Sequence, residues 1–410
     1  MRTCGGDAGG GSMRNRSLGL TLLAVTALVV SACSNTGGGA ASASAPAAAN
    51  PCAGATAHSG GTHSFPTDKT KWKIGVSTDV GTVNDKNFNE YTFNGAKAGA
   101  TALGAAEPPV VVPKDASELA KNIQGFVDQN FDIIVTAGFN NGQATNCAAH
   151  ANPDIWFIGV DQGPPCVTPD GLPDSAFKCA GDAKTLLPKY VAISYQEDQP
   201  GYLAGMVAAT MSKSGSIGAI GGITLCGPCV RYIQGFQLGA QKVNPNIKLF
   251  VSWVTTSDFT KAFNDPVTGK NFGAQFITTN KVDVLFQVAG KTGNGILDAA
   301  CDAGIYGIGV DVDQALSYPN ASKCTVTSAE KKLSLSVSTD IANIVAGTQK
   351  GGDDHWDAKR DGIGYSPFHD LESKVPATLK QQLDDALAQM KAGTLKTCPD
   401  KCGDISTLPK

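Results

Sequence analysis

Apolar runs without polar alternation recur along the chain from residue 71, and segments of helical periodicity separate them. The first series predicts strands at 72–77, 110–112, 132–136, 155–160 and 191–195, with helices at 88–103 and 116–129. Unbroken apolar runs are typical of strands that are buried on both faces. Strands that alternate with helices predict right-handed crossovers and a parallel, doubly wound α/β sheet.

The same alternation restarts after residue 200. It predicts strands at 216–220, 247–254, 282–288 and 306–310, with helices at 202–211, 230–243, 273–279 and 295–303. A second α/β unit of similar size indicates two lobes, and 410 residues are enough for two cores. Ligands of open α/β sheets bind outside the carboxyl ends of the strands, so we expect a cleft where the two sets of strand ends meet.

Two segments interrupt this pattern. Residues 163–187 are rich in Pro, Asp and Cys, which predicts a surface loop held by a disulfide. The tail from residue 353 predicts one helix at 376–392 and ends in a loop between Cys398 and Cys402.

The N-terminus indicates export. A basic head at 13–16 precedes an apolar run at 18–30 of about signal-peptide length. The run ends in Val30-Ser31-Ala32-Cys33, which resembles a bacterial lipobox, so we expect a lipid on Cys33. An ordinary secretory signal and a membrane-spanning helix are the alternatives, although the run is short for a span.

Residues 1–32 are therefore predicted to be a signal peptide, with translation starting at Met13. Ser, Gly, Ala and Pro make up almost all of residues 34–50, a composition that buries too little apolar surface to order itself. We expect a flexible tether over residues 33–69 that holds the folded part off an extracytoplasmic membrane surface.

The cysteines agree with export, because disulfides persist in oxidising compartments. Setting aside Cys4 and Cys33 leaves ten of the 12 cysteines, an even number. The close pairs are 166/179, 226/229 and 398/402, with 301/324 as a further pair, although the sequence alone leaves the connectivity open. The sequence Cys226-Gly227-Pro228-Cys229 could form a structural disulfide, take part in redox chemistry or bind zinc. A structural disulfide is favoured, because the sequence has no second CxxC and no nearby His.

Composition and motifs exclude several classes of function. The formal net charge is −3 and no basic block occurs, which argues against a nucleic-acid partner. The chain has no Gly-x-Ser-x-Gly elbow, no His-Glu-x-x-His and no Walker loop. Two of the five His, His58 and His63, fall in the predicted tether. We therefore expect no enzyme activity, no catalytic residue, no metal and no cofactor.

Five stretches carry a resemblance to the basic-membrane-protein (BMP) family of lipoproteins. They are Asp79–Asn89, Ile193–Gly205, Phe263–Pro266, Phe286–Gly295 and Gly309–Gln314, in the order of the family. The resemblance implies a type I periplasmic-binding fold with a hinge that the chain crosses three times. It implies a first lobe of 70–194 and 313–345, and a second lobe of 195–312 and 346–410.

The best-understood members of that family are purine nucleoside receptors of ABC importers, and the resemblance implies ligand-binding roles for several residues. Phe88 and Phe286 would stack on the two faces of a base, and rings of this kind tolerate different bases. From its position alone Phe88 is also a core candidate. Asn89 would offer an amide, and Gly290 would allow close backbone approach. Lys291 stands where the family has Gly, which bears on the size or charge of the ligand.

Acids at the ends of strands complete the predicted site. Asp79 comes soon after the first strand, at the expected rim of the cleft. Its carboxylate would either accept hydrogen bonds from a ligand or cap a turn or helix. The resemblance implies that Asp161 lines the pocket and that Asp311 accepts from ribose hydroxyls, a favourable geometry for a vicinal diol. Lys331 matches the Ser-x-x-Lys of the family and would donate to the same ribose; a solvated helix-face Lys is the alternative.

The sequence thus predicts a monomeric, lipid-anchored solute-binding protein that delivers a nucleoside to an ABC permease. Two rivals stay open. The same fold serves binding proteins for a sugar, an autoinducer or an amino acid, and a surface lipoprotein would instead bind a protein partner.

Overall fold

The strands predicted for residues 72–195 form most of the first of two sheets. The structure is a computed structural model that describes residues 51–409. The predicted signal peptide, Cys33 and the tether before residue 51 lie outside the described residues. All described residues belong to one compact unit. Within residues 51–409, no helix is both long and apolar enough to cross a bilayer.

The first sheet has six parallel strands in the order β11-β5-β4-β3-β1-β2. Their bounds are β1 Ile74–Ser77, β2 Val110–Val111, β3 Ile133–Ala137, β4 Trp156–Val160, β5 Tyr190–Tyr195 and β11 Gly352–Trp356. Every residue of β1, β3, β4 and β5 is buried. This burial confirms the expectation from their unbroken apolar runs, because helices cover both faces of the sheet.

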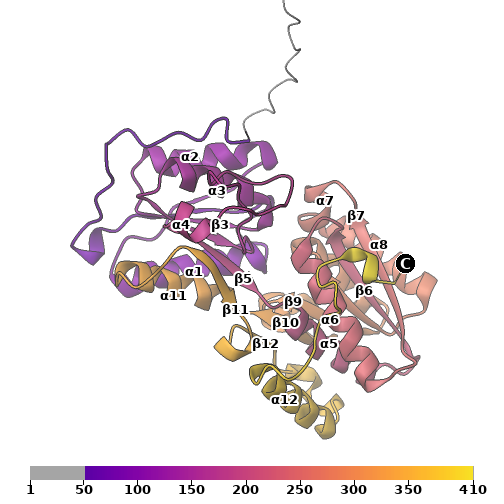
Figure 1. Ribbon diagram of the computed structural model, residues 1–410. Coiled ribbons are helices and arrows are strands. Elements are labelled where there is room, and N and C mark those ends of the chain that lie inside the picture. The colour runs from indigo at the N-terminus through magenta and orange to yellow at the C-terminus, as the bar shows by residue number, and fades with distance from the viewer. Residues whose placement is uncertain (1–50, 410) are drawn as a thin grey trace, which may run out of the picture. The chain divides into compact units, whose positions relative to one another are not determined.

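Four helices cover the first sheet. Figure 1 shows α1 (Phe88–Leu103) and α11 (Leu333–Val345) on one face, with α2 (Leu119–Asp128) and α3 (Gly142–Ala151) on the other. Gly95 and Gly99 let α1 and α11 approach closely, since a Cβ at Gly95 would lie 2.9 Å from the backbone of Ser334. The sequence did not indicate α3, whose residues are mostly small or polar.

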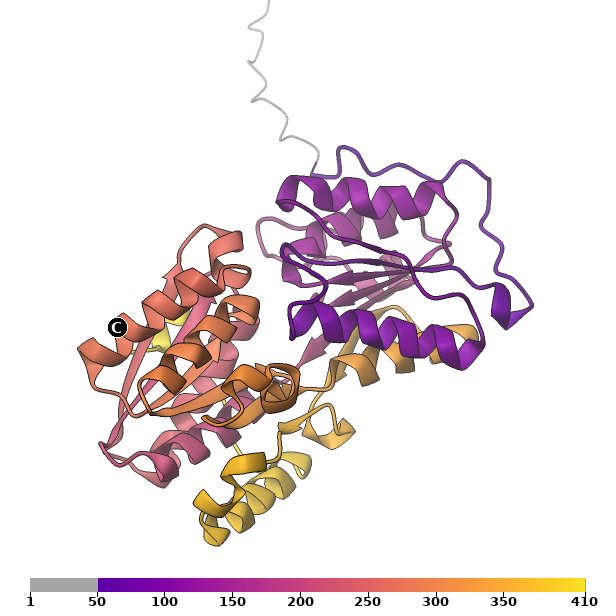
Figure 2. The ribbon, with the colours of Figure 1, turned by 180° about the vertical axis from the view of Figure 1, so that it is seen from behind.

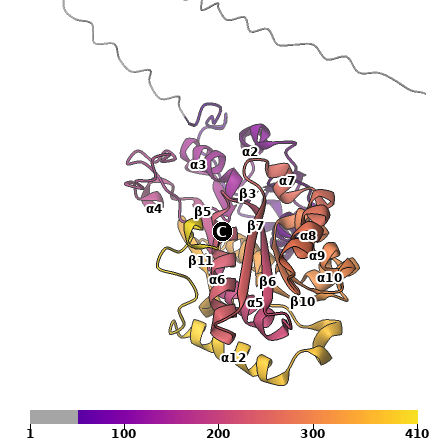
Figure 3. The same ribbon diagram turned by 90° about the vertical axis from the view of Figure 1, so that its right-hand side faces the viewer.

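The second sheet has the order β12-β10-β9-β8-β6-β7, in which only β12 is antiparallel. The strand bounds are β6 Ser216–Ile223, β7 Lys248–Thr255, β8 Val284–Val288, β9 Tyr306–Asp311, β10 Thr325–Lys331 and β12 Ile363–Tyr365. Viewed along this sheet, Figure 3 shows α6 (Gly227–Val243) on one side and α8 (Pro266–Asn280) with α9 (Gly290–Asp302) on the other.

The remaining helices flank the second sheet. They are α5 (Asp198–Met211), α7 (Phe259–Phe263), α10 (Gln314–Ser317) and α12 (Ala377–Lys391), while the short α4 (Ala183–Leu186) lies in the predicted surface loop of the first lobe. The core of this lobe joins α5 and α6 to α12, which packs against them through Leu379, Leu383 and Met390. Figure 2 shows the opposite face, covered by α8 and α9. Two doubly wound lobes of this kind confirm the predicted fold class.

The chain passes between the lobes three times, after β5, β10 and β11, but two of the crossings differ from those expected. The predicted return of 313–345 to the first lobe is corrected, because β10 pairs with β9 in the second sheet and only α11 lies on the first. Similarly, residues 346–410 do not all belong to the second lobe, because β11 pairs with β5. The polar sequence Gly-Asp-Asp-His-Trp of this edge strand carries no apolar run.

The predicted tether also ends earlier than expected. From residue 51 the chain lies against the first lobe, where Cys52 forms a disulfide with Cys147. The ring of His58 pairs with Asp154 at 3.0 Å, and that of His63 pairs with Asp132 at 2.8 Å. Both His side chains are buried. Composition alone pointed to disorder, whereas a distant cysteine and two carboxylates hold this segment.

Five disulfides join the described cysteines. The four pairs suggested by the sequence form, as Cys166–Cys179, Cys226–Cys229, Cys301–Cys324 and Cys398–Cys402, and Cys52–Cys147 is the fifth. The first of these closes the surface loop at 163–187, as predicted.

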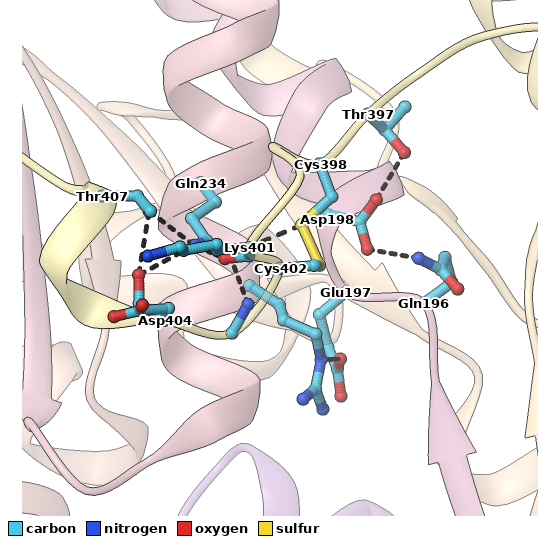
Figure 4. Close-up of a disulfide and its surroundings, with 12 residues drawn as sticks. Gln196, Glu197, Asp198, Gln234, Thr397, Cys398, Lys401, Cys402, Asp404 and Thr407 are labelled. Atoms are coloured by element: carbon cyan, nitrogen blue, oxygen red, sulfur yellow. Dashed lines mark hydrogen bonds and ion pairs between the residues drawn. A yellow bond between two sulfur atoms is a disulfide. The ribbon is translucent and has the colours of Figure 1, made fainter.

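The C-terminal segment is fastened to the second lobe around Cys398–Cys402 (Figure 4). The Gln234 side chain on α6 donates to the carbonyl oxygens of Lys401 and Asp404, both at 3.1 Å, and accepts from the Gly403 N–H. This buried amide replaces the hydrogen bonds that the short loop cannot make internally.

Candidate functional site

A cavity opens where the carboxyl ends of both sheets meet, and its volume is about 660 Å³ when the space open to solvent is included. The residues that line it are Asp79, Val80, Gly81, Thr82, Asp85, Phe88, Asn89, Gly138, Phe139, Asp161, Cys226, Pro228, Cys229, Tyr232, Phe263, Val288, Gly290, Val310, Asp311 and Lys331. Every residue predicted to bind a ligand lines this cavity except Phe286.

The loop after β1 supplies polar groups from the first lobe. The Asp79 carboxylate accepts from the Val80 N–H at 2.6 Å and from the Asn140 amide at 3.2 Å. The Asp79 N–H donates to the Asn89 side chain, which holds that amide at the cavity wall. Burial raises the pKa of Asp79 to about 6, although these hydrogen bonds oppose the shift.

Asp85 links this loop to helix α1 and to the second lobe. Its carboxylate accepts from the N–H groups of Asn87, Asn89 and Glu90 at 2.8–3.1 Å, which satisfies the free donors at the start of the helix. Burial raises its pKa to about 6. The carbonyl of Asp85 accepts from Asn294 on α9 at 3.2 Å. Asp85 was not among the predicted site residues, although an Asp shortly before a helix start is a recognisable capping signal.

Aromatic rings enter the cavity from both lobes. Phe88 begins α1 and is partly buried, and Phe139 follows β3. From the second lobe, Phe263 at the end of α7 lies with its ring centroid 6.3 Å from that of Phe139. Tyr232 comes from α6, and its hydroxyl donates to Asp311 at 3.2 Å.

The structure does not bring Phe286 to the cavity, which corrects the prediction. Phe286 is fully buried inside the second lobe, where its ring stacks on that of Phe236 at 5.0 Å. The strand β8 ends at Val288, about 7 Å further along at 3.3 Å per residue. Val288 therefore reaches the cavity on the same face, while Phe286 stays beneath it in the core.

Lys331 occupies the centre of a buried charge cluster at the end of β10. Its Nζ lies 2.6 Å from Asp161, 3.5 Å from Asp311 and 3.9 Å from Glu197, and the residue is only 4% exposed. The rings of Phe88, Tyr195 and Tyr232 surround the same ammonium group at 5.2–5.6 Å. Lys331 is thus a buried strand residue, and the alternative of a solvated helix-face Lys is excluded.

Burial and charge oppose one another in this cluster. Desolvation disfavours the charged Lys331, but the carboxylates of Asp161, Asp311 and Glu197 outweigh it and raise the pKa of Lys331 above its usual value. Desolvation raises the pKa of Asp161 to about 6 and also raises that of Asp311, while Lys331 opposes both shifts.

The two strand-end acids share an uncommon backbone conformation. Asp161 has φ 59° and Asp311 has φ 66°, the left-handed region that disfavours side chains, although Asp tolerates it better than most. The matching geometry turns one carboxylate from each lobe towards Lys331. Strained residues of this kind cluster at ligand-binding sites.

Glu197 belongs to this charge cluster but was not among the predicted site residues. It is fully buried just after the first crossing between the lobes, and it forms an ion pair with Arg231 Nε at 2.6 Å. The available signal would have been a charged residue two positions after the end of β5. By contrast, Gly290 lines the cavity as expected with φ 52°, and Lys291 is not part of the lining.

Comparisons with known proteins place this geometry in a family. Residues 72–394 match the family described as "ABC transporter substrate-binding protein PnrA-like". Basic membrane protein A of Borreliella burgdorferi is 26% identical over 68% of this chain and 74% of its own length. Basic membrane protein D of the same species is 31% identical over 67% and 80%. The ABC transporter nucleoside-binding protein BmpA of Lactococcus lactis is 27% identical over 60% and 65%.

Solved structures agree on the fold. A solute-binding protein of an ABC transporter system from Aeropyrum pernix superimposes with a TM-score of 0.65 at 20% identity, covering 80% of this chain and 94% of its own. A sugar-binding protein of a Bacillus halodurans ABC transporter gives 0.53 at 13% identity, over 74% and 100%. At these identities the likeness concerns the fold alone.

Proposed function

Because the chain belongs to the family of PnrA-like ABC transporter substrate-binding proteins, which are not enzymes, we propose that it binds a purine nucleoside and delivers it to a permease. The observation that carries this proposal is the cavity between the lobes, which joins aromatic rings to a cluster of carboxylates around Lys331. The relative from Lactococcus lactis, named as nucleoside-binding, supports the choice of ligand.

The rings would receive the base. Phe88 from the first lobe and Phe263 from the second offer apolar faces to a flat heterocycle, and Phe263 takes the part first assigned to Phe286. Stacking of this kind buries much apolar area and accepts either purine. The Asp79 carboxylate and the Asn89 amide lie in the same lobe as Phe88 and would pair with polar groups on the edge of the base.

The carboxylates would receive the sugar. Asp161 and Asp311 are acceptors, and Lys331 is a donor, so together they match the vicinal hydroxyls of a ribose. Arriving hydroxyls would replace part of the contact between Lys331 and the acids. A pocket of several acids with one Lys also disfavours phosphorylated ligands, because each phosphate adds negative charge.

Ligand contacts from both lobes would drive closure. Phe88 and Asp161 belong to the first lobe, whereas Phe263 and Asp311 belong to the second, so a nucleoside contacts all four only when the lobes are together. Binding then shifts the population towards the closed form, which the permease recognises. Members of this family are extracytoplasmic, and we propose a monomer anchored by a lipid on Cys33.

Calorimetric titration with adenosine and guanosine tests the proposal. Phe88→Ala should weaken nucleoside binding about 5- to 150-fold, since stacking contributes about 1–3 kcal/mol per base. Asp311→Ala should also weaken it strongly, because the ribose loses an acceptor. Neither change should unfold the protein. Phe177→Ala is the matched control, because this ring is 83% exposed on the loop at 163–187.

Two results would contradict the proposal. One is a wild-type protein that gives no heat with either nucleoside, and the other is an unchanged affinity in both cavity variants. Titration with ribose and galactose in parallel separates the nucleoside proposal from a sugar receptor, because a sugar receptor would bind these without a base.

A further inference from the structure

Among the five disulfides of the described residues, Cys226–Cys229 alone lines the cavity between the lobes. Cys226 and Cys229 are 3% and 5% exposed, and Pro228 between them also lines the cavity. This disulfide therefore belongs to the surface that a bound ligand would cover. The nucleoside proposal gives it no role.

Stability does not account well for a disulfide at this place. Cys226 and Cys229 are three residues apart, and closing so short a loop restricts the unfolded chain little. Cys398–Cys402 also closes a short loop, but that loop carries the contacts that fasten the C-terminal segment to Gln234. Cys226 and Cys229 already sit in a regular helix start.

The start of α6 favours thiol–disulfide exchange. Cys226 is the N-cap of this 17-residue helix, and its Sγ accepts from the Cys229 N–H at 3.1 Å. Backbone N–H groups at a helix start stabilise a thiolate, so Cys226 is the better leaving group when Cys229 is attacked. A Cys-x-x-Cys pair at this position has the arrangement of a reducible site.

We propose that Cys226–Cys229 is a thiol-exchange site within the ligand cavity, that dithiols reduce it in the folded protein, and that its reduction and ligand binding exclude one another. The coupling to a nucleoside rests on the proposed function, whereas the reactivity does not.

The exchange is a balanced two-electron reaction. A dithiol, as its thiolate, attacks Cys229 Sγ, the S–S bond breaks, and Cys226 leaves as a thiolate. The second thiol of the dithiol then attacks the mixed disulfide, closes a cyclic disulfide and releases Cys229. The dithiol is oxidised, the protein disulfide is reduced, and the two protons of the dithiol end on the two cysteines.

Geometry explains the mutual exclusion. Both cysteines are nearly covered by protein and line the cavity, so a reductant would reach their disulfide through the space that the ligand would fill. If reduction needs an empty cavity, a ligand at 100 times its Kd leaves about 1% of the protein open and slows reduction about 100-fold. Two free thiols in the cavity lining would in turn reshape the wall that receives the ligand.

The test treats the folded full-length protein with dithiothreitol, quenches the reaction with iodoacetamide, and maps the alkylation of each cysteine by mass spectrometry. Without ligand, Cys226 and Cys229 should become alkylated while circular dichroism still reports a folded protein. Saturating adenosine should slow this reduction about 100-fold. It should leave the reduction rate of Cys398–Cys402 unchanged, because Cys402 is exposed and neither of these cysteines lines the cavity. Adenosine affinity of the Cys226→Ser/Cys229→Ser variant should fall at least 10-fold.

Three results would overturn the proposal. The pair stays oxidised as long as the protein is folded, adenosine binds without slowing its reduction, or the reduced, alkylated protein binds adenosine with unchanged affinity. The affinity of the reduced, alkylated protein is measured on the wild-type chain, so this result does not depend on whether the Ser variant folds. If adenosine gives no heat at all, the proposed function fails, and the reduction without ligand alone decides whether this site exists.

Discussion

Replacement of Lys331 by Met removes the ammonium group that lies between three buried acids, Asp161, Asp311 and Glu197. The side chain keeps its length, so packing against Phe88, Tyr195 and Tyr232 is largely retained. At an effective dielectric constant of about 20, the contact of 2.6 Å with Asp161 alone amounts to about 6 kcal/mol of attraction. Desolvation offsets much of this, and loss of one partner of a buried pair costs about 3–5 kcal/mol. We expect the upper part of that range, because Asp311 loses the same partner, whereas Glu197 keeps its ion pair with Arg231.

The stability that Lys331→Met loses should depend on pH. The pKa of Asp161 is about 6 in the folded protein and 3.8 in the unfolded chain, so the folded state binds a proton more tightly, and stability falls as pH rises between the two values. Without Lys331 the acids are harder to ionise, which raises their pKa further. The difference in unfolding free energy between wild type and variant should therefore be larger at pH 7.5 than at pH 5, as measured by urea denaturation with circular dichroism.

Lys332→Met is the matched control. Lys332 is the next residue, its side chain is 41% exposed, and it pairs with Glu330. Loss of an exposed pair costs less than about 1 kcal/mol. Equal losses in the two variants, or a loss for Lys331→Met that does not change with pH, would refute the reasoning. Partial recovery in Lys331→Met/Asp161→Asn would identify the unpaired carboxylate as the cause.

Two further predictions concern stability away from the cavity. Burial, with Asp354 nearby, raises the pKa of Asp340 on α11 to about 8, so the stability of the wild type should fall as pH rises from 4 to 8. At pH 9, Asp340→Asn should be more stable than the wild type by about 2–5 kcal/mol in urea denaturation. Parallel curves of stability against pH for the two proteins would contradict this. Cys52→Ala/Cys147→Ala opens a loop with a sequence separation of 95 and should lower the unfolding free energy by about 4–5 kcal/mol in urea denaturation. Cys398→Ala/Cys402→Ala opens a much shorter loop and should lower it by about half as much or less. Equal losses in the two variants would show that loop length is not the cause.

Most of the fold could be predicted from local patterns. The buried strands β1, β3, β4 and β8 are apolar runs, and α1 begins at Phe88 and ends at Leu103 as predicted. The end of α1 could be predicted because Gly104 follows it. Gly adopts the left-handed conformation seen there, with φ 69°, at little cost in free energy. By contrast, β10 is fully buried but rich in Thr, Ser and Glu, so it carries no apolar signal. Its polar side chains are satisfied by distant partners such as Ser366.

The amino-acid sequence correctly predicted two α/β lobes, close pairs of cysteines, and strand-end acids at the mouth of a cleft. It did so because burial of parallel strands, helix ends and acids after strands are local properties that the chain order carries. The tertiary structure alone decided that Phe263 rather than Phe286 reaches the cavity, and that Glu197 joins Asp161 and Asp311 around Lys331. Which side chains meet depends on where each strand ends and on how two lobes pack, and residues that lie more than 100 positions apart set that geometry.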